Sequence, residues 1–400
     1  MKILVVNAGS TSYKCRLFDM NTQTELAQGG VERVGGSDAV ASFCTPTAKG
    51  VDKAVMTVPT HGDAVRQINT YLCSPDFGAI GDLAEIDAVG FKTIQAGEKN
   101  GSVLLSSDVL DAMERYAPLA PAHNPPYLEC IRYFGTILPN TPLVGVFEPG
   151  FHKDIPEHAR VFGAPYEWYE RFGVQKYGYH GASFRYVTEY VLDTMNRSRE
   201  SVRIIACHLG GSSSVCAYKN GRSVDVSMTF SPQSGLLQSA RVGDIDPFVL
   251  PYIMEQKKIT LTAALDELGK NGGLKGISGV SGDMRDILAA ADAGNARASL
   301  AVDKFVYDVV RYIGSFYAVM EGVDVIAFSG GIGFESARVR KMIIDRVAFL
   351  GIDLDPDENE KRRDGPKTRR GSKVQVVAVN TNEEIIVARE TKRVVDTISQ

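Results

Sequence analysis

The sequence predicts an α/β protein built from two duplicated domains. Its 400 residues, 44% hydrophobic and 23% charged, have the composition of a folded chain and exceed the length that one core usually supports. A strand-and-turn pattern over residues 3–34 recurs over residues 203–228. Between and after these segments, short apolar runs alternate with stretches of helical periodicity, as expected for sheets covered by helices.

Residues 3–34 predict three antiparallel strands, the first two joined by the Gly/Ser turn AGSTS. Residues 203–228 repeat this order, with the turn LGGSSS and an Asn-Gly hairpin signal at 220–221. Asn7 then corresponds to His208, and Gly9 to Gly210. Because such turns present backbone N–H groups and hydroxyls, two of them facing each other across a cleft would hold a polyphosphate.

Two strands are predicted next, over 86–91 and 142–147, with helices over 108–117 and 183–195. Lys92 and Glu148 directly follow these strands. Ligands of open α/β sheets gather beyond the carboxyl ends of the strands, so we expect chemistry at both residues.

The second half predicts a helical stretch over 283–321, a buried strand, a Gly-rich turn at 330–333 and a further helix. This order is typical of a nucleotide site. The segment 355–373 predicts an exposed loop with solvated charges, and a final strand leads into a helix with Glu383 and Glu384 in its first turn.

Composition excludes several classes of function. A net charge of −4 with interspersed acids and bases indicates neither nucleic acid nor a membrane surface as partner, which leaves a small molecule. Met1 leads directly into a strand and no apolar run is long enough to span a bilayer, so we expect a cytoplasmic protein. The six cysteines form no CxxC pair, which favours reduced thiols over disulfides or zinc.

Several long motifs spread over nearly the whole chain carry a family resemblance. They are NAGSTSYK (7–14), APLAPAHNPP (117–126), FEPGFH (147–152), YGYHGASFRYV (177–187), HLGGSSS (208–214), KNGRSVDVSM (219–228), ARVGDIDP (240–247), GISGVSGDMRDI (276–287), FSGGIG (328–333) and TNEEIIVARET (381–391). In content and order they resemble the acetokinase family, which contains acetate, propionate and related carboxylate kinases.

The resemblance implies transfer of the γ-phosphoryl group of ATP, reversibly, to a short-chain carboxylic acid, giving an acyl phosphate. It implies two RNase H-like domains of the actin-like ATPase superfamily with a cleft between them, and a homodimer. Residues 1–150 with 384–400 would form the acyl and metal domain, and residues 151–383 the nucleotide-binding domain.

Site residues are carried over by the same motifs. Asn7 and Glu384 match positions that hold Mg²⁺, or Mn²⁺, through water, and the positions for catalysis are Lys92, Glu148, His180 and Arg241. The acyl pocket matches Lys92, Ile94, Ala122, Tyr179 and Pro232. The nucleotide-binding positions are Lys14, His208, Leu209, Gly210, Gly211, Ser212, Asp283, Met284, Arg285, Gly331, Ile332, Gly333, Phe334 and Glu335.

These residue types suit the reaction. A carboxylate is ionised at neutral pH and needs no general base, whereas bringing two anions together needs cations in fixed positions. Lys92, His180, Arg241 and the metal would supply them, with Glu148 orienting the metal or the cations. Structural alternatives remain: a salt bridge for Arg241, a turn for His180, and a helix cap with a local ion pair for Asp283 and Arg285.

The chain departs from the family around the acyl group. Phe91, Lys92 and Gln95 stand where His, Arg and His are usual, and Glu148 replaces Asp; lysine keeps the charge but not the guanidinium fork. Ala122 replaces Leu and Tyr179 replaces Phe. We therefore expect a roomier, more polar pocket that favours an acid of about three to five carbons, or a hydroxylated acid, over acetate.

The nucleotide segments differ as well. Phe334 and Glu335 replace Glu and Asn, which leaves open another nucleotide or pyrophosphate as the phosphoryl donor. A weakly active paralogue that senses nucleotide or acyl phosphate is a further alternative, since fold alone does not fix activity. The retained acid and cations favour an active kinase.

Overall fold

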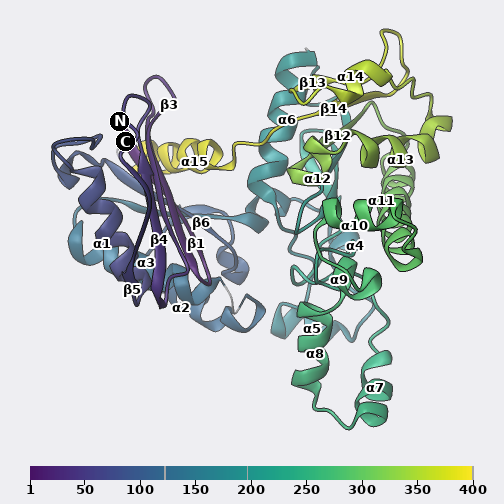
Figure 1. Ribbon diagram of the computed structural model, residues 1–400, viewed down its shortest axis with the longest axis horizontal. Coiled ribbons are helices and arrows are strands. Elements are labelled where there is room, and N and C mark those ends of the chain that lie inside the picture. The colour runs from purple at the N-terminus through teal and green to yellow at the C-terminus, as the bar shows by residue number, and fades with distance from the viewer. Residues whose placement is uncertain (121–122, 196, 399–400) are drawn as a thin grey trace. The chain divides into compact units, whose positions relative to one another are not determined.

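The computed structural model describes residues 1–120, 123–195 and 197–398, and the chain divides into two compact units. Unit 1 comprises Met1–Gly150 and Asn382–Gln400, and unit 2 comprises Phe151–Thr381. Each unit has its own sheet with helices packed against it (Figure 1).

The sheet of unit 1 has the order β5-β4-β3-β2-β1-β6-β8-β7. Strands β1 to β5 pair antiparallel, whereas β6 runs parallel to both β1 and β8. Only Ser10 and Thr11 form the turn between β1 and β2, so most of the predicted Gly/Ser turn is strand. The strands are β1 (Lys2–Gly9), β2 (Ser12–Asp19), β3 (Thr24–Glu32), β4 (Gly36–Cys44), β5 (Val51–Val58), β6 (Ala88–Thr93), β7 (Ser102–Leu104) and β8 (Leu143–Phe147).

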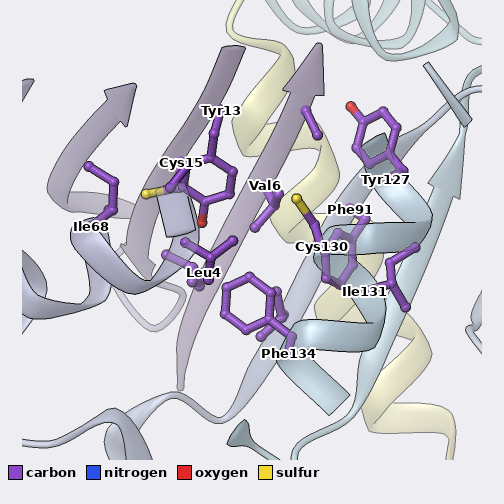
Figure 2. Packing of buried hydrophobic residues seen from close by; sticks show 14 of the residues in the cluster. Leu4, Val6, Tyr13, Cys15, Ile68, Phe91, Tyr127, Cys130, Ile131 and Phe134 are labelled. Carbon is purple, nitrogen blue, oxygen red and sulfur yellow. The ribbon is translucent and has the colours of Figure 1, made fainter. Parts of the chain in front are cut away.

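Helices cover both faces of this sheet, because successive side chains of a strand point to opposite faces. Phe91 packs edge-on against Phe134 of α3, in the core shown in Figure 2. The preceding residue, Gly90, lies against α15, where an added Cβ would come within 2.2 Å of the Thr391 hydroxyl oxygen. The helices of unit 1 are α1 (His61–Leu72), α2 (Ser107–Arg115), α3 (Asn124–Ile137) and α15 (Glu383–Ile398).

The sheet of unit 2 has the order β11-β10-β9-β12-β14-β13. Its antiparallel strands continue into the parallel strands β9, β12 and β14 and end on an antiparallel edge strand, which repeats the order β3-β2-β1-β6-β8-β7 of unit 1. The predicted α/β fold with a duplicated arrangement is therefore confirmed. The strands are β9 (Arg203–His208), β10 (Ser214–Lys219), β11 (Arg222–Val226), β12 (Val325–Ser329), β13 (Gly365–Pro366) and β14 (Gln375–Ala378).

Unit 2 carries most of the helices. They are α4 (Glu157–Arg160), α5 (Tyr166–Phe172), α6 (Gly181–Met195), α7 (Val249–Lys257), α8 (Leu261–Lys270), α9 (Gly273–Ser278), α10 (Met284–Asp292), α11 (Ala296–Met320), α12 (Gly330–Glu335), α13 (Ala337–Val347) and α14 (Pro356–Glu360). Short 3₁₀ helices in the chain are η1 (Leu83–Glu85), η2 (Gly97–Lys99), η3 (Ala117–Leu119), η4 (Glu148–His152) and η5 (Ala348–Leu350). In the part of the chain that the structure describes, no helix combines the length and apolarity needed to cross a membrane.

Three further local predictions were wrong. The helical stretch over 283–321 is two helices, broken where Gly294 takes φ +88°. The predicted turn at 330–333 is the start of helix α12. The charged segment 355–373 contains α14 and β13, and the fully buried Lys367 donates from Nζ to the Lys361 and Arg363 carbonyls at 2.8 and 3.1 Å. All six cysteines are free thiols, as predicted.

Candidate active site

In unit 1, the carboxyl ends of three parallel strands bring charged residues together. The registers pair Val6 of β1 with Phe91 of β6, and Thr93 of β6 with Phe147 of β8. Lys92 and Glu148 therefore meet at one edge of the sheet, with Lys92 Nζ 3.4 Å from Glu148 Oε1. The structure brings this predicted pair into direct contact.

Glu383 completes this cluster. It is the first residue of α15 and its carboxylate forms an ion pair with Lys92. Burial opposes a charge on Lys92, but the carboxylates of Glu383 and Glu148 outweigh it and raise the pKa of Lys92 well above its ordinary value. Lys92 is therefore an ammonium at neutral pH. The sequence pattern marked both glutamates at this helix start, but not which one reaches Lys92.

The predicted metal positions Asn7 and Glu384 line one cavity of about 580 Å³, together with Lys14. Lys14 lies across Gly30, where an added Cβ would stand 3.2 Å from its Cγ and 2.8 Å from the Tyr13 carbonyl oxygen. The Asn7 Oδ1 accepts a hydrogen bond from the Tyr127 hydroxyl at 3.2 Å. Tyr127 was not among the predicted site residues.

In unit 2, two predicted nucleotide segments lie side by side. The Leu209 carbonyl accepts from the Ile332 and Gly333 amides at 2.8 and 3.0 Å, and the Leu209 amide donates to the Ser329 carbonyl at 2.8 Å. This contact needs glycine at 330, whose φ is +74° and whose Cβ would stand 2.6 Å from the Leu209 oxygen. The segment from His208 to Ser212 thus meets the start of α12.

His180 and His208 stack with their ring centroids 4.2 Å apart. His180 Nδ1 lies 2.8 Å from the Ser214 hydroxyl, and His208 Nδ1 lies 2.7 Å from the Ser183 hydroxyl. His180 adopts φ +59°, a left-handed conformation that a non-glycine residue takes at a cost. Both imidazole rings are therefore held in fixed orientations beside the Gly/Ser turn that follows β9.

Arg241 joins the same turn. Its Nη1 lies 3.3 Å from the Ser212 hydroxyl, 3.3 Å from the Pro232 carbonyl and 3.2 Å from Gln238 Oε1. Burial lowers the pKa of Arg241, although a guanidinium stays charged at neutral pH. These acceptors are neutral, so they orient the guanidinium without neutralising its charge.

The sequence as a whole matches known proteins over nearly its full length. The profile of the acetokinase family matches residues 2–389. The chain belongs to the acetokinase family. The Bacillus subtilis acetate kinase is 41% identical over 394 residues, which cover 98% of this chain and 99% of that protein.

Solved acetokinase structures have the same fold as this chain. The crystal structure of Porphyromonas gingivalis acetate kinase is similar with a TM-score of 0.91 and 36% identity, covering 98% of this chain and 99% of that one. A propionate kinase from Francisella tularensis is similar with a TM-score of 0.90 and 31% identity, over 98% and 99% of the two chains.

In the acetokinase motif around Lys92, the residues that replace the usual histidines lie in the interior of unit 1. Phe91 and Gln95, which stand where histidines are usual, are both fully buried. Gln95 Oε1 accepts from the Gly97 amide at 2.7 Å and from Asn100 Nδ2 at 2.6 Å, so it shapes the loop before β7. Lys92, the third replacement in this motif, is the one whose side chain pairs with Glu148 and Glu383. Ile94 packs partly against the core of unit 1.

The predicted polarity of the acyl pocket was based on Tyr179, and that argument was wrong. The Tyr179 hydroxyl donates to the Phe230 carbonyl at 2.9 Å, so it needs no polar group on the substrate. The prediction of a hydroxylated acid loses its basis. Ala122, the source of the predicted extra room, lies outside the described residues.

Two other predicted nucleotide segments have clear structural contacts. Asp283 caps α10, accepting from the Arg285 amide at 2.9 Å and pairing with the Arg285 side chain at 2.6 Å, which lowers the pKa of Asp283 to about 2. Met284 is buried as the first residue of that helix. Phe334 is also buried, and Glu335 lies 3.5 Å from Arg362.

Arg340, which the sequence analysis missed, supports the α12 segment. It is fully buried in α13 and donates to the Gly333 and Phe334 carbonyls, at 2.9 and 2.5 Å. It also contacts the Asn359 side chain at 2.9 Å and the Asn359 carbonyl. No sequence motif signals this role, because an arginine in a helix is ordinarily a surface residue.

Arg340→Met is expected to destabilise the protein by about 2–4 kcal/mol, because the carbonyls of α12 lose their donors in a buried place. Nucleotide affinity should fall as well. Chemical denaturation measures the first effect and equilibrium binding the second. The control is Arg338→Met on the same helix, which removes an exposed pair with Asp292 and should cost less than about 1 kcal/mol. Equal losses in the two variants would contradict the assignment.

Proposed function

We propose that this acetokinase transfers the γ-phosphoryl group of ATP to a short-chain carboxylic acid and that the reaction is reversible. The similarity of the whole chain to proteins named acetate kinase and propionate kinase carries this proposal. In the forward direction a carboxylate oxygen bonds to the γ-phosphorus while the bond from that phosphorus to the β–γ bridging oxygen breaks. The products are an acyl phosphate and ADP.

The residues support such a transfer without a general base. Lys92, kept as an ammonium by two carboxylates, would attract the anionic acid or the phosphoryl oxygens. Arg241 and His180 would stabilise the charge spread over the transferring group. The segment from His208 to Ser212, together with α12, would hold the nucleotide phosphates through backbone amides other than those of Leu209, Ile332 and Gly333, which already donate to carbonyls of the protein.

The metal positions fit a hydrated ion. Among residues 1–120, 123–195 and 197–398, no three His, Cys, Asp or Glu side chains gather in a way that could hold a metal. Mg²⁺ in kinases keeps several waters and takes only one or two protein carboxylates besides the phosphates. Asn7 and Glu384, which line one cavity, would hold Mg²⁺ or Mn²⁺ in this manner, and the ion would neutralise phosphate charge.

We also propose a cytoplasmic homodimer. Unit 2 exposes apolar side chains on the adjoining helices α7 and α8 and just before them: Phe248 is 81% exposed and Tyr252 63%, with Leu261 and Leu265 about half exposed. In the view of Figure 1 these helices lie at the lower end of unit 2, away from its sheet. Exposed large apolar side chains on two helices that contact each other are typical of a protein–protein contact.

The test is a hydroxylamine-trapped acyl phosphate assay over short carboxylic acids and several phosphoryl donors. We expect acyl hydroxamate with ATP and with acetate, propionate or a slightly larger acid. If only another nucleotide or pyrophosphate supports turnover, that compound and not ATP is the phosphoryl donor. Tight nucleotide binding without any hydroxamate would instead favour a protein that senses nucleotide or acyl phosphate.

A further inference from the structure

Tyr127 links the carboxyl end of strand β1 to helix α3. The residue lies in the first turns of α3 and is 1% exposed. Its ring packs in the core of unit 1, and Figure 2 shows its hydroxyl pointing away from Ile131 and Phe134, toward the end of β1. The hydroxyl lies 3.2 Å from Asn7 Oδ1.

The Tyr127 hydroxyl is the donor in this hydrogen bond. An amide oxygen can only accept, so the phenolic proton of Tyr127 is directed to Asn7 Oδ1. A phenol carries its proton at neutral pH. Tyr127 is thus a permanent donor toward Asn7.

A donor at this place decides which way the Asn7 amide points. The two ends of an asparagine amide are nearly equal in size but opposite in hydrogen-bonding character. With Tyr127 donating, the oxygen end is fixed on the Tyr127 side and keeps a second lone pair. Asn7 also lines the cavity with Glu384 and Lys14, so this lone pair is available for a water of a bound cation.

We propose that Tyr127 is a positioning residue that holds the Asn7 amide with its oxygen ready to accept from a cation-bound water, which rests on the Mg-nucleotide site of the proposed function. Without the hydroxyl, the amide turns freely and presents N–H groups to that water for part of the time. The binding of a metal-nucleotide then weakens, whereas the contacts of the carboxylic acid substrate stay the same.

The experiment is Tyr127→Phe, which removes the hydroxyl and keeps the ring. Binding of Mn²⁺ with ADP is measured by the electron paramagnetic resonance of free Mn²⁺, which needs no turnover. We expect roughly tenfold weaker binding, the effect of one lost buried hydrogen bond to an oriented polar group. The control is Tyr133→Phe on the same helix, whose hydroxyl accepts from Arg66 at the surface and whose loss should leave binding unchanged.

A second background separates orientation from general damage. Asn7→Asp places an acceptor at both ends of the group, so orientation no longer matters and the added effect of Tyr127→Phe should shrink below about threefold. Three outcomes would each overturn the proposal. Tyr127→Phe could bind Mn²⁺-ADP as tightly as wild type, or it could cause the same tenfold loss in the Asn7→Asp background. The third is that wild type does not bind Mn²⁺-ADP. If the effect of Tyr127→Phe on Mn²⁺-ADP binding depends on Asn7 as expected, but the protein phosphorylates no carboxylate, the proposed function is overturned and this inference stands.

Discussion

Arg241→Ala is expected to lower kcat by roughly a hundredfold or more, with a smaller change in nucleotide affinity. The Arg241 guanidinium is largely buried and oriented by the neutral oxygens of Ser212, Pro232 and Gln238. Because none of these contacts is an anion, the charge would be available to a bound anionic group. A desolvated charge of this kind stabilises the transition state far more than it would in water. Steady-state kinetics with ATP and the preferred acid measure the effect.

Two further variants give this result its meaning. Arg311→Ala removes an arginine of the same unit, whose side chain pairs with Asp244 near the surface, and should leave kcat within about twofold of wild type. Arg241→Lys keeps a charge but not the fork, and should lie between wild type and alanine. An unchanged kcat in Arg241→Ala would remove this residue from the mechanism.

Lys92→Met is expected to lower both catalytic efficiency and stability. It leaves the carboxylates of Glu148 and Glu383 close together, with only 4% and 16% of their side chains exposed, and without the cation between them. Breaking a buried ionic group in this way costs about 3–5 kcal/mol, and losing the ammonium at the site should lower kcat/KM roughly a hundredfold. Calorimetry and steady-state kinetics measure the two effects.

Lys176→Met is the matched control, because Lys176 and Asp225 form a pair of similar burial outside the site. It should destabilise the protein and leave kcat/KM nearly unchanged. Adding Glu383→Gln to Lys92→Met relieves the repulsion between the two acids, so part of the stability should return without the activity. The account of this cluster is wrong if Lys92→Met is both as stable and as active as wild type.

The sequence predicted that Lys92 and Glu148 lie near each other in unit 1, but it did not predict which other side chains join them. Lys92 and Glu148 could be placed because each follows an apolar run in the sequence, and parallel strands end at the same edge of a sheet. The contacts of Glu383 with Lys92 and of Tyr127 with Asn7 could not be predicted. These residues lie on helices α15 and α3, and the rotation of a helix against a sheet depends on side-chain packing. The adjacent glutamates at 383 and 384 were the one available signal.

Side-chain direction was the second limit. Phe91 and Gln95 were interpreted as replacements of site histidines. Strand alternation places Phe91 in the core, however, and the Gln95 side chain accepts a hydrogen bond within a loop. The sequence predicted a Tyr179 hydroxyl without a partner in the protein, but this hydroxyl donates a hydrogen bond to the Phe230 carbonyl. Whether a polar side chain already has a partner depends on distant backbone, which no local pattern reports.

The outer strands of unit 1 show a third limit. β4 and β5 extend the meander of β1, β2 and β3, but were not predicted. Much of β5 is exposed and its alternation mixes Lys53 and Asp52 with apolar residues, so its hydrophobic pattern is weak. The duplicated strands, by contrast, were predictable because both copies carry the same turn chemistry.

The central claim is phosphoryl transfer between a nucleotide and a carboxylate. Phosphorus NMR of the wild-type protein with ATP, Mg²⁺ and propionate tests it most directly, since ATP, ADP, acyl phosphate and inorganic phosphate give separate resonances. The account predicts that acyl phosphate and ADP appear together in equal amounts, and that added ADP with acyl phosphate regenerates ATP. Release of inorganic phosphate alone, or an unchanged ATP spectrum across acetate, propionate and butyrate, would contradict it.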